Sequence, residues 1–237
     1  MGRTAMAVPG KGGSMQRFAL GYEQAARLVL VAFITNLALL AHTIMGLVLV
    51  GFFPSLAATC GVFRRWLTDE DREWGIAQTW RTFHRLWKRE FKGANIFGWA
   101  QAAIWALLLG DYWIVNFHRT GRVGVFVSGI LFCLMVFMIL ATALSWVLFA
   151  LYDQGVGWIL VRSVQMVLAR PWMSVVLAFG LALMAFACWS WPGLAVVFGP
   201  ALPCLLSSSA VWFYGRLDGF SVRMRRGAQG GMATKGE

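Results

Sequence analysis

Residues 54–92, PSLAATCGVFRRWLTDEDREWGIAQTWRTFHRLWKREFK, are the long polar interruption of an otherwise apolar chain of 237 residues, and they hold eight of its 21 lysines and arginines. Apolar side chains recur here every three or four residues, at Ile76, Trp80, Phe83, Trp87 and Phe91. Cationic side chains follow the same period about a quarter turn away, at Arg81, Arg85, Lys88 and Lys92. The pattern predicts an amphipathic helix that lies in the lipid headgroup zone or packs against a partner.

The composition around this stretch indicates an integral membrane protein. Hydrophobic residues make up 59% of the chain and charged residues only 13%, whereas about a quarter of the residues of a soluble domain are charged. We therefore expect an all-α fold, a polytopic membrane helical bundle with about five transmembrane helices in residues 28–215. The predicted spans are 28–53, 94–115, 123–152, 171–191 and 193–214.

The remaining segments are shorter or more polar. We expect Pro54 to end the first span, because proline has no amide hydrogen to continue the helix. Residues 55–67, 72–92 and 156–169 are predicted as cytoplasmic interfacial helices. Residues 1–27 are predicted as an N-terminal tail with a short interfacial helix, and residues 216–237 as a basic, disordered C-terminal tail.

The distribution of basic residues predicts the threading. With five spans, residues 54–92, residues 153–170 and the C-terminal tail share one side of the membrane and hold 15 of the 21 lysines and arginines, against six on the other side. The positive-inside rule makes the first side cytoplasmic. We expect a multi-pass protein of the bacterial plasma membrane with a cytoplasmic C-terminus.

The sequence offers no sign of catalysis. No acid-base pair, nucleophile or metal-binding spacing is found, so we expect no enzyme, no metal and no cofactor. Although the net charge is +11, the charges flank apolar spans and accompany no recognition motif, which favours anionic lipid over nucleic acid. The cysteines and histidines are dispersed: Cys60, Cys133, Cys188, Cys204, His42, His84 and His118.

Four residues inside the spans are candidate functional positions. Asn36 and His42 are polar groups of the first span, and we favour hydrogen bonds to a neighbouring helix over a substrate or proton site. Pro200 and Pro203 must kink the last span and release backbone carbonyls within the membrane. A structural kink is the favoured interpretation there, with a binding or hinge position as the alternative.

Short motifs resemble a known family. Asn36-Leu37 lies in the first span, and Phe52-Phe53-Pro54-Ser55-Leu56-Ala57-Ala58, Arg64-Arg65-Trp66, Trp80-Arg81-Thr82-Phe83 and Phe91-Lys92 follow. With them the chain is similar to the YesL family (DUF624) of bacterial integral membrane proteins, over about Phe18 to Leu217. The resemblance implies association with carbohydrate uptake, because members are often encoded beside ABC-type sugar importers. It implies no catalytic residue.

The resulting hypothesis is a non-catalytic accessory or regulatory component that docks through its basic aromatic helix. The expected partners are membrane lipid and subunits of an ABC sugar importer, and a homo-oligomer is compatible with the sequence. The alternative is a small permease for an uncharged solute such as a sugar, which would need a continuous polar cavity lined by Asn36, His42 and Ser207. The residues predicted to bind lipid or partner are Arg64, Arg65, Trp80, Arg81, Arg85, Trp87, Lys88 and Lys92.

Overall fold

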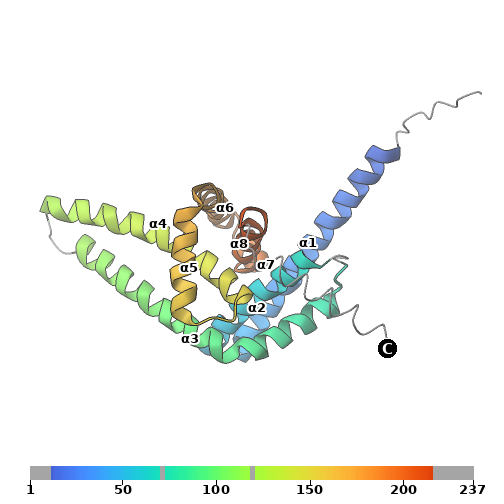
Figure 1. Ribbon diagram of the computed structural model, residues 1–237, viewed down its shortest axis with the longest axis horizontal. Helices are drawn as coiled ribbons and strands as arrows, with labels where there is room; N and C mark the ends of the chain where they lie inside the picture. Colours follow the sequence, from blue (N-terminus) through green and yellow to red (C-terminus); the bar gives the residue numbers. More distant parts are fainter. Residues whose placement is uncertain (1–11, 70–72, 118–120, 216–237) are drawn as a thin grey trace, which may run out of the picture.

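The computed structural model describes residues 12–69, 73–117 and 121–215, and these residues form helices and no strand (Figure 1). The predicted all-α fold class is therefore confirmed. In chain order the helices are α1 (Gly12–Met45), α2 (Leu49–Thr68), α3 (Ile76–Phe117), α4 (Gly121–Leu151), α5 (Val156–Ala169), α6 (Pro171–Ser190), α7 (Pro192–Phe198) and α8 (Ala201–Tyr214).

Four of these helices are long and apolar enough to cross a bilayer, namely α1 over Tyr22–Met45, α3, α4 over Val123–Leu151 and α6. Helices α7 and α8 pass the same test together but are bent by 67°, so the pair is either a broken fifth span or a re-entrant loop. Large apolar side chains of α4 face outward, with Val125 76% and Phe126 71% exposed. Such a surface suits acyl chains and not water.

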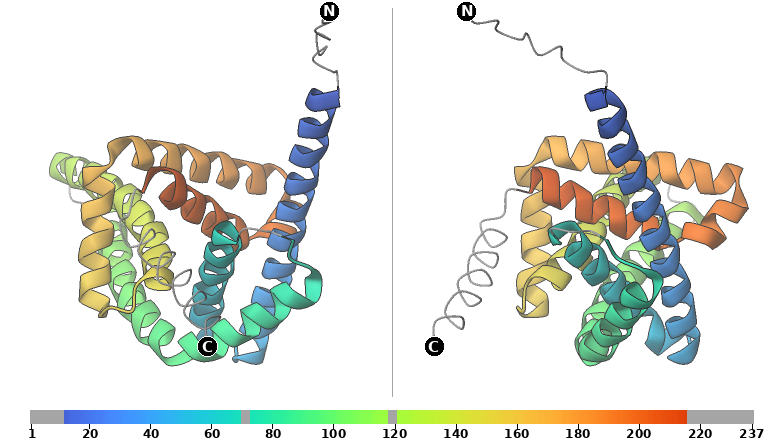
Figure 2. Two further views of the ribbon diagram at one scale, coloured as in Figure 1. Left: turned by 45° about the vertical axis from the view of Figure 1, so that its right-hand side comes forward. Right: turned by 90° about the vertical axis from the view of Figure 1, so that its right-hand side faces the viewer.

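Helix α2 forms the centre of the bundle, where it contacts α1, α3, α4 and α8 (Figure 2). The sequence predicted an interfacial helix over 55–67, and the structure places these residues in α2, largely buried by its neighbours. Ala58 and Phe63 are fully buried, and Cys60 is 1% exposed. Small residues on α2 let its neighbours approach closely; a Cβ added at Gly61 would come within 3.0 Å of Leu86 on α3.

The first span ends earlier than predicted. Helix α1 stops at Met45, and Pro54 lies inside α2 instead of ending a helix. The break falls at Leu47 and Val48, which both have φ of 60° and so leave the right-handed helical region. The Val48 amide donates to Thr43 O at 2.8 Å, which closes the turn. Residues 28–53 therefore form parts of two antiparallel helices and not one long span.

Helix α3 joins two elements that the sequence separated. Residues 76–92 of the predicted interfacial helix and the predicted span 94–115 lie in one helix of 42 residues, which bends near its middle (Figure 1). The reason is that no proline interrupts the stretch, and Gly93 alone only weakens a helix. The basic stretch is thus held rigidly to the span that follows it.

The later helices begin and end close to the predicted ranges. Helix α5 has the predicted bounds 156–169, and α4 and α6 differ from 123–152 and 171–191 by two residues at most. Residues 12–27 of the predicted N-terminal tail continue without a break into the α1 span. Residues 1–11 and the predicted C-terminal tail 216–237 lie outside the described residues.

Candidate functional site

The N-terminal half of α3, residues 76–92, carries the predicted cationic surface. Its apolar side points inward, because Phe83 and Leu86 are 0% and 4% exposed. Trp80 lies at the margin with 36% exposed, and Trp87 is half-buried. All four cationic side chains of the predicted stripe are exposed. We call them the basic face of α3: Arg81, Arg85, Lys88 and Lys92.

The apolar side of this segment packs on α1 around His42. The ring centroids of Trp80, Phe83 and Trp87 lie 5.6, 5.0 and 5.4 Å from the His42 ring. Of the two arrangements that the sequence left open, packing against protein is thus realised within the chain itself. The rings cannot lie fully among acyl chains, and the basic face is the surface that this segment presents outward.

His42 also joins α1 to α3 by a hydrogen bond to His84. His42 Nδ1 lies 2.8 Å from Ala38 O, which can only accept, so we assign the proton of the neutral ring to Nδ1. The other nitrogen, His42 Nε2, then accepts from His84 Nδ1 at 2.9 Å. His42 is 3% exposed. The polar group of the first span therefore makes the structural bond that the sequence favoured.

Asn36 lies against the break between α7 and α8. Its side-chain amide donates to Val196 O at 3.0 Å and to Val197 O at 2.9 Å. In a continuous helix the Val196 carbonyl would accept from residue 200, but Pro200 has no amide hydrogen. Two of the predicted intramembrane candidates thus meet, and the amide of Asn36 replaces a donor that Pro200 lacks.

Pro203 lies in the first turn of α8, where amide groups have no partner within the helix. Ser207 Oγ donates to Pro203 O at 2.7 Å within the same helix. Hydrogen bonds inside the bundle therefore engage Asn36, His42 and Ser207. None of the three lines the polar pocket that the structure forms elsewhere.

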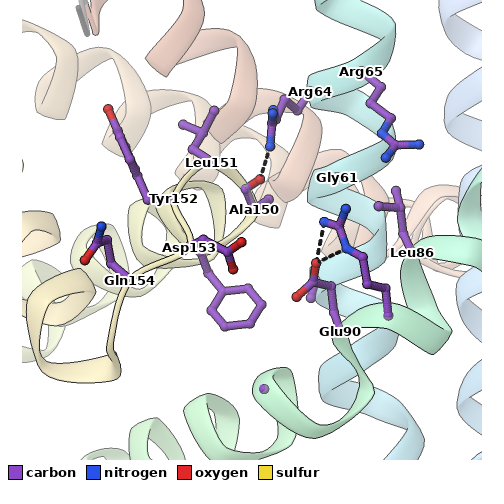
Figure 3. Close-up of a pocket in the computed structure, with 14 residues that line it drawn as sticks. Gly61, Arg64, Arg65, Leu86, Glu90, Ala150, Leu151, Tyr152, Asp153 and Gln154 are labelled. Carbon is purple, nitrogen blue, oxygen red and sulfur yellow. Dashed lines mark hydrogen bonds and ion pairs between the residues drawn. The ribbon is translucent and has the colours of Figure 1, made fainter. Parts of the chain in front are cut away.

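That pocket, of about 320 Å³, opens between the C-terminal turns of α2, the middle of α3 and the link from α4 to α5 (Figure 3). Its floor is apolar, with Ala57, Leu86 and Phe149. Its rim is polar and charged: Arg64, Arg65, Arg89, Glu90, Tyr152, Asp153 and Gln154. The sequence singled out Arg64 and Arg65 but missed the other side chains, which come from segments about 25 to 90 residues further along the chain.

The charges of the pocket are only partly balanced. Arg64 donates to Ala150 O, one of the last carbonyls of α4, and so caps that helix. Arg89 donates through Nε and Nη2 to Glu90 Oε1, at 2.7 and 2.5 Å. Desolvation and the nearby charges of Arg89 and Arg85 lower the pKa of Arg65, although its side chain stays exposed at the rim.

Metal ligands are not gathered in the part of the chain that the structure describes, where no group of three or more His, Cys, Asp or Glu could hold an ion. Cys60 and Cys204 are buried free thiols, and Cys133 is exposed. The expectation of a protein without cofactor rests on the sequence.

The four long apolar helices and their outward-facing apolar side chains indicate a multi-pass helical membrane protein. Residues 32–112 match the family described as "Protein of unknown function, DUF624". The matched part runs from α1 through most of α3 and is narrower than the resemblance read from the motifs. It includes Asn36, His42, Arg64, Arg65 and the basic face.

One curated protein is similar to the chain over most of its length. The chain is 25% identical over 181 residues to "Uncharacterized protein YesV" of Bacillus subtilis (strain 168). The alignment covers 76% of this chain and 84% of that protein. No solved structure is significantly similar to the chain.

Proposed function

We propose that the protein is a non-catalytic accessory or regulatory membrane component that docks on a partner protein through the basic face of α3. The observation that carries the proposal is the orientation of this segment. Its apolar side is occupied by His42 and the α1–α2 pair, so its four exposed cations are available for an acidic surface. Charges of one sign on a rigid helix give an interface orientation and a fast association rate.

We propose an ABC-type sugar importer as the partner. Support for this choice is the family resemblance, since members are often encoded beside such importers. We further propose that the basic face lies at the cytoplasmic side of a bacterial plasma membrane, together with the C-terminus. The excess of basic residues in the segments flanking the spans supports this orientation.

The alternative permease function has less support. A pathway for an uncharged solute needs polar groups that face a common cavity. Asn36, His42 and Ser207 instead form hydrogen bonds within the bundle. Asn36 bonds to Val196 and Val197, His42 to Ala38 and His84, and Ser207 to Pro203. The bonds of Asn36 to Val196 O and Val197 O also join the break between α7 and α8 to α1.

The docking function is tested with a variant in which Arg81, Arg85, Lys88 and Lys92 are replaced by glutamine. Affinity purification of the full chain from native membranes, with mass spectrometry, should recover a specific partner with the wild type. We expect the variant to recover at least about tenfold less of this partner. Each cation removed from beside an anionic surface weakens binding by about 1 kcal/mol.

A matched control removes the same number of charges elsewhere, by replacing Arg216, Arg223, Arg225 and Arg226 with glutamine. This control should recover the partner as the wild type does. If the basic-face variant recovers as much partner as the wild type does, docking through the basic face is refuted. Loss in both would show that net charge, and not this face, controls the association.

The side of the membrane is tested by labelling a single cysteine at position 88. In a variant with Lys88→Cys and the four native cysteines replaced by serine, we expect an impermeant maleimide to label cells only after the membrane is permeabilised. Lys88 is exposed, so burial would not prevent the reaction. Labelling of intact cells would place the basic face outside and overturn the proposed orientation.

A further inference from the structure

We propose that the pocket between α2, α3 and the α4–α5 link binds a phosphate group esterified to a small polar alcohol. The ligand would be either the headgroup of a phospholipid or a soluble phosphate ester. The pocket is separate from the basic face, and the proposal does not depend on the docking function.

The charge of the pocket favours an anion. Arg64, Arg65 and Arg89 contribute three positive charges and Glu90 and Asp153 two negative charges, which leaves a net charge of +1. Two of the arginines are close enough for the charge of Arg89 to act on Arg65, and Arg85 adds to the repulsion. A bound anion would relieve this repulsion between like charges.

The side chains favour phosphate among anions. Guanidinium groups present several donors in one plane, which matches the oxygens of a phosphate group. Arg89 forms an ion pair with its neighbour Glu90 at 2.5 Å at the rim of the pocket. Arg65 lines the same pocket from α2, a different helix.

The opposite rim suits the alcohol part of the ligand. Figure 3 shows the Asp153 carboxylate turned into the same space as the Arg64 guanidinium, with Glu90 across from them. Among the described residues Asp153 makes no ion pair, and its oxygens can accept from a hydroxyl or an ammonium group. Glycerol and ethanolamine esters of phosphate carry such groups.

The size of the pocket is maintained by glycine. Gly61 and Gly93 line it from α2 and α3. A Cβ at Gly93 would lie 3.6 Å from Phe149, an ordinary contact. Alanine should therefore fit at position 93, whereas a larger side chain would extend into the space. A volume of about 320 Å³ lies at the lower end for small-molecule sites, as a headgroup requires.

The test compares two pocket variants with two controls, all as full chains purified in detergent. The pocket variants are Arg65→Gln with Arg89→Gln, which removes charge, and Gly93→Phe, which fills the space. The controls are Lys88→Gln with Lys92→Gln, which removes the same charge from the basic face, and Gly93→Ala. Arg64 is left in place because it caps α4.

Two arms separate the sources of the phosphate. In the first, the purified protein is reconstituted into nanodiscs of phosphatidylcholine with phosphatidylglycerol or phosphatidylethanolamine and analysed by native mass spectrometry for retained lipid. In the second, glycerol 3-phosphate, phosphoethanolamine and inorganic phosphate are titrated by calorimetry. We expect the wild type and both controls to bind in at least one arm, and both pocket variants to bind at least about tenfold more weakly. The double variant removes two charged contacts, each worth about that factor, and the Gly93→Phe side chain occupies the space of the ligand.

Binding in the first arm alone identifies a lipid headgroup, and binding in the second alone identifies a soluble ester. The proposal is overturned if the wild type binds neither probe, or if the pocket variants bind as tightly as the controls. Because partner recovery depends on the basic face and not on these variants, failure here leaves the docking test unaffected, and the reverse also holds.

Discussion

Replacing Gly51 with alanine is expected to lower the free energy of unfolding by about 3 kcal/mol, the upper end of the usual cost of overpacking, because the contact is rigid. A Cβ at Gly51 would lie 2.7 Å from Thr43 O, 2.8 Å from Gly46 Cα and 2.9 Å from His42 O. All three are backbone atoms of α1 and its turn, so no side-chain rotation can relieve the contact. The two helices must move apart.

The measurement is thermal unfolding in detergent, followed with a thiol-reactive dye. Cys60 and Cys204 are buried and report unfolding, once the other two cysteines, Cys133 and Cys188, are replaced by serine. Gly129→Ala is the control, since nothing lies within 4 Å of a Cβ there, and alanine should stabilise the helix by up to about 1 kcal/mol. A Gly51→Ala midpoint equal to that of the parent would contradict the close helix contact.

This contact also bears on the proposed docking surface. The aromatic side of α3 packs on the His42 ring. The backbone carbonyl of His42 lies at the contact with Gly51. A wedge between α1 and α2 would therefore shift the support of the basic face. The stability of the α1–α2 hairpin and the position of the basic face are therefore coupled through His42.

The sequence predicted which segments are helical and apolar better than it predicted where they turn. The composition and the period of the spans indicated the class of fold, and Pro171 marked the boundary between α5 and α6. The turn after α1 went unseen because Leu47 and Val48 are residues that rarely adopt positive φ. Pro54 was the stronger local signal, yet α2 tolerates it.

The sequence predicted functional residues only where they lie close together in one segment of the chain. A helical period of aromatic residues from Trp80 to Trp87 is the same whether lipid or α1 covers it, so the sequence left both open. The pocket was missed because Arg64, Arg89 and Asp153 are distant along the chain, and only the packing of α2, α3 and α4 brings them together. Local patterns contain no information on such a junction.

Replacing Asn36 with leucine is expected to destabilise the protein by about 2–4 kcal/mol, the cost of leaving two carbonyls at the α7–α8 break without a donor. The carbonyls are Val196 O and Val197 O, which accept from the Asn36 amide at 3.0 and 2.9 Å. Water cannot replace the amide in a bundle interior where Asn36 is 1% exposed. The same dye assay on Cys60 and Cys204 measures the loss.

The cause is separated from a general packing effect by a double-mutant cycle with Pro200→Ala. Alanine at position 200 restores an amide hydrogen, which can reach Val196 O if the backbone straightens toward a regular helix. Asn36→Leu should then cost at least about 1 kcal/mol less in the Pro200→Ala background than in the wild type, a coupling outside the usual error of additivity. Costs that agree within about 0.5 kcal/mol would mean that Asn36 stabilises the bundle without acting as the substitute donor. A measured coupling would instead tie the polar residue of the first span to the proline break of the last, across 160 residues of chain.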